Sequence, residues 1–144
     1  MESWGRRLVV DMNFSDTVAR VSKEFRQEGF EISGQLDVRD NLARTLGEDF
    51  RRYTIITFWH PVLGLQALHQ SLEVGTELLV NVVVYELADQ ESVIAVADAL
   101  PSLSADRLWR DNWPALQPIE VEFDERLGRA LGRMPRRQVS AFVM

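Results

Sequence analysis

Apolar and polar positions along this chain follow two different periods. A period of two, typical of strands, covers residues 6–14, 30–38, 53–60, 76–87 and 92–99. A spacing of three to four, typical of helices, covers residues 15–29, 39–50 and 61–72. The pattern therefore predicts alternating strands and helices, followed by two strands that a short turn joins into a hairpin.

Residues at the segment ends support these boundaries. Ser15 is a suitable N-cap for the first helix, and Gly29 suits the left-handed position after its last turn. Pro61 lacks a backbone N–H and fits the first position of the third helix. Residues 76–87 are apolar on both faces, which predicts a central strand.

Beyond Pro101 the strand pattern stops. A weak helix is predicted over residues 104–113 and a stronger one over residues 118–134. In the second helix, carboxylates crowd the start and arginines the end, the order that the helix dipole favours. Glu122–Arg126 and Glu125–Arg129 lie four residues apart and would stabilise it as ion pairs.

We therefore predict one α+β domain over residues 1–144, with a mixed, largely antiparallel sheet of about five strands and helices packed on one face. Residues 1–100 would form its strand-rich core and residues 101–144 a helical C-terminal extension. In the segment 30–38, the apolar residues Phe30, Ile32, Leu36 and Val38 would share the core face. The polar residues between them predict that the other face of the sheet is wet.

Composition excludes several classes of function. The chain has no cysteine, so disulfides, thiolate metal sites and cysteine nucleophiles are ruled out. Its net charge of −6 argues against a nucleic-acid partner or an anionic membrane surface. No apolar run approaches the ~20 residues needed to span a bilayer, and no apolar leader stretch opens the chain. We expect a cytoplasmic protein without a cofactor.

The two histidines are the main candidates for chemistry. If His60 caps a helix that contains His69, the rings lie roughly 13 Å apart on opposite faces. One metal ion cannot bind both, so we predict no metal site. Capping or packing is the favoured role for His60, and the alternative is an acid–base role, since histidine titrates near neutrality. No other pattern predicts a catalytic residue.

The start of the helix at Pro61 also suggests a ligand site. Free backbone N–H groups at a helix N-terminus suit a small anion or carboxylate. The residues of this predicted site are His60, Pro61, Val62 and Gly64, with Tyr53 and Trp59 alongside. The simpler interpretation is a cap that satisfies these donors within the chain.

Two features near the C-terminus have no assigned chemistry. Trp109 and Trp113 lie one helical turn apart, which favours a seal at the edge of the core over an aromatic platform for a ligand. The basic cluster Arg133, Arg136 and Arg137 precedes a short apolar tail. Because an unpartnered apolar tail would be exposed, we expect it to pack on a neighbouring subunit.

Three stretches share the pattern of one protein family: FSDTVARVSKEFRQEGFEI, YTIITFWHPVLGLQAL and GTELLVNVVVYEL. In the second, Phe58, Pro61 and Gly64 match, whereas Trp59 and His60 replace a glycine and an asparagine that are usual there. Through them the chain resembles the domain of unknown function 302 family over residues 14–99. The resemblance implies a compact α+β domain and a homodimer, and it implies no reaction.

These observations lead to two hypotheses about function. The first is a non-catalytic domain that binds a small ligand or a protein partner and acts as a homodimer; an apolar central strand and an apolar tail are what a subunit interface requires. The alternative is a small enzyme that uses His60 as acid or base at a helix N-terminus.

Overall fold

The computed structural model describes residues 5–97 and 113–137. Its strands are β1 (Gly5–Val10), β2 (Glu31–Asp37), β3 (Tyr53–Trp59), β4 (Val80–Ala88) and β5 (Glu91–Ala97). Its helices are α1 (Phe14–Gln27), α2 (Val38–Leu46), α3 (Pro61–Gln70), the 3-10 helix η1 (Leu72–Glu77) and α4 (Trp113–Gly132).

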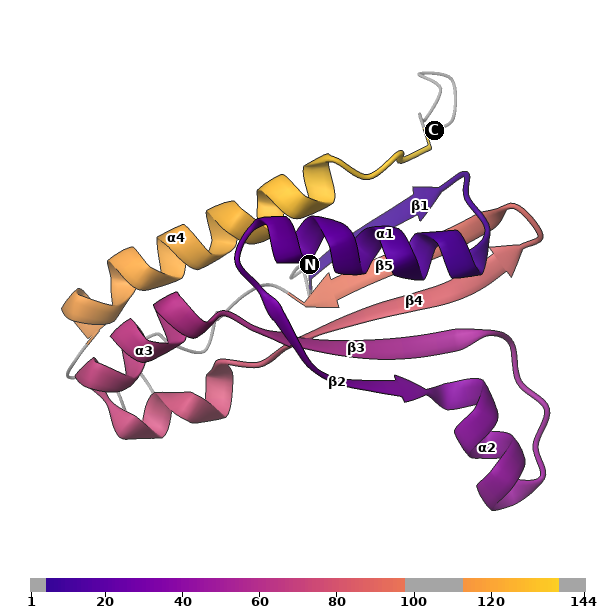
Figure 1. The fold of residues 1–144 in the computed structure, drawn as a ribbon, viewed down its shortest axis with the longest axis horizontal. Coiled ribbons are helices and arrows are strands. Elements are labelled where there is room, and N and C mark those ends of the chain that lie inside the picture. Colours follow the sequence, from indigo (N-terminus) through magenta and orange to yellow (C-terminus); the bar gives the residue numbers. More distant parts are fainter. Residues whose placement is uncertain (1–4, 98–112, 138–144) are drawn as a thin grey trace.

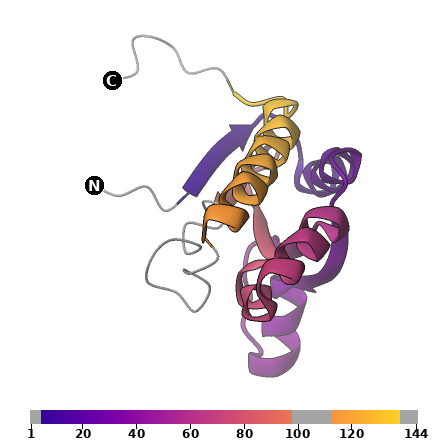
Figure 2. The ribbon, with the colours of Figure 1, turned by 90° about the vertical axis from the view of Figure 1, so that its left-hand side faces the viewer.

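The five strands form one sheet in the order β1-β5-β4-β3-β2, and every neighbouring pair is antiparallel. The predicted central strand is therefore confirmed as β4, the third of five. Helices α1, α3 and α4 lie on the same side of the sheet, as Figures 1 and 2 show from two directions. The α+β prediction with helices on one face is confirmed.

A single hydrophobic core fills the space between this sheet face and the helices. The ring of Phe25 in α1 stacks on that of Phe58 in β3 with centroids 4.5 Å apart, and Phe30 meets Phe123 of α4 edge-on at 5.3 Å. Leu116, Leu127 and Leu131 of α4 belong to the same buried cluster. The C-terminal helix therefore completes the core that the strands begin.

Side-chain caps set the helix boundaries. Asn13, rather than the predicted Ser15, caps α1: its side-chain oxygen accepts from the backbone N–H of Asp16 at 2.8 Å. The first strand ends accordingly at Val10, short of the predicted Phe14. Asp37 caps α2 in the same way. Gly29 follows α1 with φ of 93°, which confirms the left-handed residue predicted there.

Two predicted boundaries differ around the later elements. Residues 72–77 form η1, so that β4 begins only at Val80. Helix α4 begins before its predicted start and includes Pro118 within its N-terminal part. Most of the weak helix predicted over residues 104–113, Trp109 included, lies outside the described residues, and nothing is described of the side chain of Trp113.

A β-bulge in β2 changes which residues face the core. The pairing with β3 shifts between Ile32 and Gly34, so that Leu36 pairs with Ile55 on the sheet face opposite the helices. Leu36 is 45% exposed there. Gln35 points to the helix side instead and bonds the Thr54 hydroxyl at 3.4 Å. The prediction that Leu36 shares the core face with Ile32 is therefore wrong, because an extra residue reverses the alternation.

Candidate functional site

His60 lies at the junction of β3 and α3, buried with 3% of its surface exposed. Its Nδ1 accepts the backbone N–H of Leu63 at 3.2 Å, which caps α3. Because Nδ1 accepts, the ring proton belongs on Nε2, which donates to the backbone oxygen of Glu28 at 2.9 Å. Both ring nitrogens of His60 are therefore bonded within the chain.

Burial lowers the pKa of His60, and the nearby Arg126 guanidinium lowers it further, against the opposing effect of the Glu28 carbonyl. The neutral ring with its proton on Nε2 fits both hydrogen bonds, because a proton on Nδ1 would point at the Leu63 N–H. To act on a substrate, the imidazole would have to give up either the cap or the bond to Glu28.

The other residues of the predicted ligand site are only partly brought together. Val62 is exposed at the start of α3, and Gly64 lies directly against the indole ring of Trp59. Tyr53 lies at the opposite end of β3, about 20 Å from Trp59 by the rise of an extended strand.

Few backbone donors remain at the N-terminus of α3. Pro61 has no N–H, Leu63 donates to the ring of His60, and Gly64 donates to the His60 carbonyl at 2.7 Å. Only the N–H of Val62 is left in this part of the described chain. The site therefore offers an anion one backbone donor, and the predicted ligand binding there stays a prediction.

Helix α4 packs beside this junction. A groove of about 290 Å³ separates it from α3, lined by Val62, Leu63, Gln66, Pro118, Ile119, Glu122 and Arg126. The predicted pair Glu122–Arg126 forms at 2.9 Å. Arg126 also donates to the same Glu28 carbonyl that His60 uses, at 3.0 Å. The junction is thus tied to both α1 and α4.

A buried carboxylate cluster joins α1 to α4 next to this carbonyl. Glu24 and Glu28 are only 4% and 8% exposed. Arg133 donates to Glu24 at 2.6 Å and to Glu28 at 2.7 Å. Arg20 forms a second ion pair with Glu24 at 2.8 Å, and Arg129 forms a second ion pair with Glu28 at 3.0 Å. Every charge in the cluster is therefore paired.

The cluster depresses the pKa of both carboxyl groups. Hydrogen bonds from Arg133 and Arg20 lower the pKa of Glu24. At Glu28 burial pushes the pKa upward, but hydrogen bonds from Arg133 and Arg129 outweigh it. Both side chains are therefore ionised carboxylates near neutrality.

Sequence reasoning missed this cluster, although a signal was present. Glu24 and Glu28 continue the stripe of Thr17 and Val21 at spacings of three and four, which places them on the buried side of α1. The cluster also explains part of the basic segment: Arg133 pairs here, and Arg137 pairs with Asp11 and Glu91. Arg129 forms its ion pairs with Glu28 and Glu122, and the predicted partner Glu125 acts on it only as a nearby opposite charge.

His69 lies exposed in the last turn of α3, at the far end of the helix from His60. Among the described residues, no three histidine, aspartate or glutamate side chains gather as a metal site would require.

The sheet face opposite the helices, here called the open face, is apolar along its central strands. Its side chains lie in rows across paired strands: Tyr53, Tyr85 and Val93 in one row, and Leu36, Ile55, Val83 and Ala95 in the next. The rings of Tyr53 and Tyr85 stack with centroids 5.7 Å apart, and Phe50 continues the series at 6.0 Å. None of the described helices covers this face (Figure 2). The prediction that this face is polar is therefore wrong at the centre of the sheet, where paired apolar side chains lie on it.

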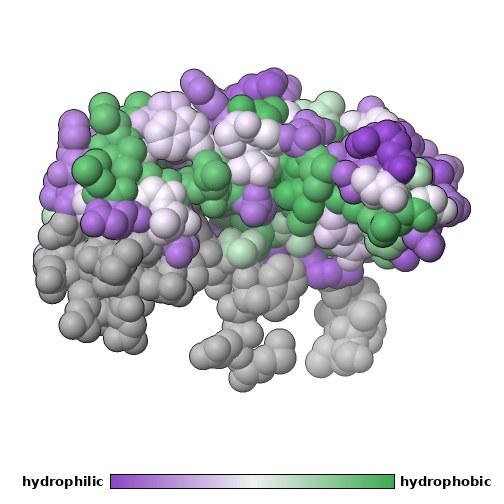
Figure 3. All heavy atoms as spheres, turned by 90° about the horizontal axis from the view of Figure 1, so that it is seen from below, coloured by the Kyte–Doolittle hydropathy of each residue, from purple (hydrophilic) through white to green (hydrophobic). Residues whose placement is uncertain are grey.

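Other exposed apolar side chains are scattered. Figure 3 shows hydrophobic areas alternating with hydrophilic ones from the end of the molecule that carries α3 and η1 to the end that carries α2. The exposed apolar side chains include Leu65 of α3, Leu72 of η1 and Leu46 of α2. Helix α2 contains no buried residue.

The strand order and the one-sided helical layer define the class of the protein as an α+β domain with an antiparallel sheet. Its family follows from a family model described as "Domain of unknown function DUF302", which matches residues 7–134. The chain belongs to this family, as its sequence motifs indicated.

A solved structure supports the same conclusion. The chain is similar to an uncharacterized conserved DUF302 protein from Bacillus stearothermophilus, with a TM-score of 0.76 and 25% sequence identity. The match covers 92% of this chain and 99% of the other. No curated protein matches the chain. Within the described residues, no helix combines the length and apolar character needed to cross a membrane.

Proposed function

We propose that this chain is a binding domain without catalytic activity of its own, and that it acts as a homodimer whose two copies meet through the open face. The observation that carries the proposal is the apolar row of Leu36, Ile55, Val83 and Ala95. A sheet with one solvated face normally carries polar side chains there. An apolar face of this kind is suited to being covered by a partner.

The distribution of charge over the surface favours a second copy of the chain as that partner. The chain carries a net charge of −6, so two copies repel each other over most of their surfaces. The two central rows of the open face, extended to Val9 and Arg7 of β1, contain no carboxylate. Two copies can therefore approach here without opposing acidic groups.

Shape is compatible with the same arrangement. The next row contains Gly34, Thr57 and Asn81, none of which carries a large side chain. Two pleated sheets pack face to face about 10 Å apart when their side chains interdigitate. A twofold axis would bring the same apolar rows of both copies together.

The state of His60 supports a role without catalysis. Its two ring nitrogens are engaged by Leu63 and Glu28, and the nearby charged groups of the junction are held in ion pairs. A general base needs a free nitrogen within reach of a substrate proton. The residue is better suited to fixing the junction of β3 and α3.

Light scattering during gel filtration tests the dimer. We expect a mass of twice the 16.5 kDa chain at micromolar concentration. Ile55→Glu, which places a charge in the apolar row, should give the single-chain mass with an unchanged circular dichroism spectrum. Leu65→Glu makes the same kind of change at an exposed position of α3 and should leave the dimer intact. A single-chain mass for the wild type, or a dimer of Ile55→Glu, would refute the proposal.

A further inference from the structure

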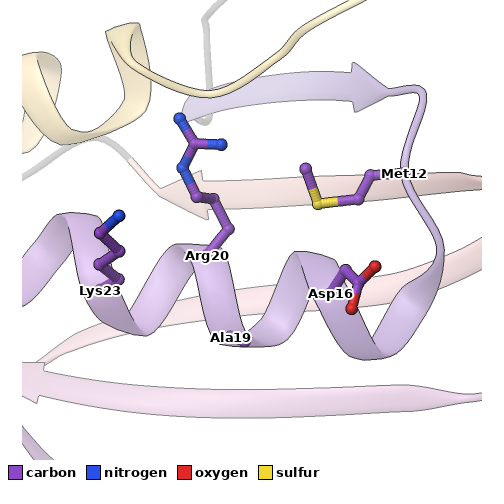
Figure 4. A pocket seen from close by; sticks show the side chains of 5 residues that line it. All are labelled: Met12, Asp16, Ala19, Arg20 and Lys23. Atoms are coloured by element: carbon purple, nitrogen blue, oxygen red, sulfur yellow. The ribbon is translucent and has the colours of Figure 1, made fainter.

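A groove along α1 lies on the helical side of the sheet, away from the open face. Its volume is about 350 Å³, and it is lined by Met12 and by Asp16, Ala19, Arg20 and Lys23 of α1. The spacing of these α1 residues, three or four apart, places them on one stripe of the helix. Figure 4 shows Arg20 and Lys23 extending from the helix toward the same side, with Met12 at the other end of the groove.

The cationic side of this groove has unused hydrogen-bond donors. Arg20 donates from Nε to Glu24 and from one terminal nitrogen to the Arg133 carbonyl, both at 2.8 Å. Its other terminal nitrogen has no partner among the described residues. Lys23 is exposed and likewise makes no ion pair or hydrogen bond within the described part of the chain.

The position of Arg20 is fixed before any ligand arrives. Glu24 is buried and Arg133 belongs to the carboxylate cluster, so both groups that hold the guanidinium are rigidly placed. A prearranged guanidinium binds an anion at a lower cost in conformational entropy than a mobile one. The exposed Arg136 adds a further cation on this side of the sheet, since its bridge to Val10 sets both side chains on the same face.

The rest of the groove defines the body of the ligand. Met12 and Ala19 offer an apolar lining, and a methionine side chain adapts to irregular apolar shapes. Asp16, which accepts from the Asn13 side chain at 3.1 Å, stands at the other end of the stripe. It lies about 10 Å from Lys23 along the helix axis. Its carboxylate disfavours a second negative charge there.

From this arrangement we infer that the α1 groove binds a small monoanion with one carboxylate head and a short apolar body. The head meets the free donors of Arg20 and Lys23, and the apolar body lies on Ala19 and Met12. Because the groove and the open face are on opposite sides of the sheet, the inference does not depend on the homodimer.

Calorimetric titration of the full chain with four probes tests the ligand class. Octanoate should bind saturably, whereas acetate lacks the apolar body, octanamide lacks the charge and suberate carries a second carboxylate. We expect each of these three to bind about tenfold more weakly than octanoate, the effect of losing roughly one charge-assisted or apolar interaction. No saturable binding of octanoate, or equal binding of octanamide, would overturn the inference.

Three variants locate the site. Lys23→Gln removes one cation and should weaken octanoate binding by about tenfold. Ala19→Glu, at an exposed helical position, places a carboxylate in the groove and should abolish binding. Arg39→Gln makes the same loss of charge on α2 and should leave binding unchanged. If Lys23→Gln and Ala19→Glu both bind octanoate like the wild type, the site lies elsewhere and the assignment is wrong.

Discussion

Gly64 lies within helix α3 against the indole ring of Trp59, and a Cβ at this position would collide with that ring. Helix propensity alone predicts that Gly64→Ala stabilises α3 by about 1 kcal/mol. The collision reverses the sign, and we expect the variant to lose about 1–3 kcal/mol of unfolding free energy through overpacking. Urea unfolding measures this difference. Gly128→Ala in α4, where only the flexible Arg6 is near, should be neutral or stabilising, and equal effects of the two variants would contradict the argument.

His60 joins α3 to the end of α1 through its two ring nitrogens. His60→Ala leaves the Leu63 N–H without its cap and opens a cavity, so we expect a loss of about 2–4 kcal/mol in unfolding free energy. His69→Ala, at an exposed position of the same helix, should cost less than about 0.5 kcal/mol. Comparable losses in the two variants would show that the hydrogen bonds of His60 are unimportant.

The lowered pKa of His60 also predicts the sign of a pH effect. Near neutrality the ring is neutral in both the folded and the unfolded chain. As the pH falls below the unfolded value of about 6.5, the unfolded chain takes up the proton first, so stability decreases. The decrease continues until the pH reaches the lower folded pKa. In His60→Gln this part of the pH dependence should disappear from urea midpoints measured between pH 7 and pH 5, and its persistence would assign it to another group.

At this scale the sequence identified residues whose conformational preference is strong. Pro61 and Gly29 take the positions predicted, because a fixed φ and a left-handed φ leave few alternatives. The choice between Asn13 and Ser15 as N-cap was not decided locally, since both side chains can accept from a helix N–H. It depends on where β1 ends against β5, which is a tertiary contact.

At the scale of elements, the carboxylate cluster is the main polar link between α1 and α4. Arg133→Met leaves Glu24 and Glu28 with one cation each. An incompletely paired buried carboxylate costs several kcal/mol of stability. The cost is smaller here because the Arg133 side chain is 36% exposed, so that water screens the interaction. We expect a loss of about 1–3 kcal/mol by urea unfolding. Arg44→Met breaks an exposed pair with Asp40 on α2 and should change stability by less than about 0.5 kcal/mol.

Acid should weaken the same link. The pKa values of Glu24 and Glu28 are depressed in the fold, so their contribution is complete above the unfolded value of 4.5 and is lost as the pH falls through the folded values. In Arg133→Met the loss of stability between pH 5 and pH 3 should be smaller than in the wild type, because the pKa values of Glu24 and Glu28 are less depressed in the variant. If the stability of the variant falls with pH in parallel with that of the wild type, the cluster is not the source of the acid sensitivity.

Periodicity predicted the existence of these elements better than their surroundings. The apolar spacing within residues 39–50 correctly predicted a helix. Nevertheless α2 buries no residue, because periodicity shows which face is apolar and not what covers it. The prediction for β2 took no account of its bulge, because no local residue indicates one. It therefore placed Leu36 on the wrong face of the sheet. The ion pairs of α1 with α4 join residues more than a hundred positions apart, beyond the reach of any local pattern.

For the whole molecule, the proposed homodimer predicts a link between concentration and stability. If two copies cover each other's open face, dissociation accompanies unfolding, and the melting temperature must rise with protein concentration by mass action. We expect such a rise in differential scanning fluorimetry between micromolar and submillimolar concentrations. In Ile55→Glu the open face no longer pairs, so its melting temperature should be independent of concentration and should lie below that of the wild type at every concentration. Leu65→Glu should retain the wild-type slope. If the melting temperature of the wild type does not change with concentration over this range, the rows of Ile55 and Tyr85 face solvent in the folded protein and the dimer proposal fails.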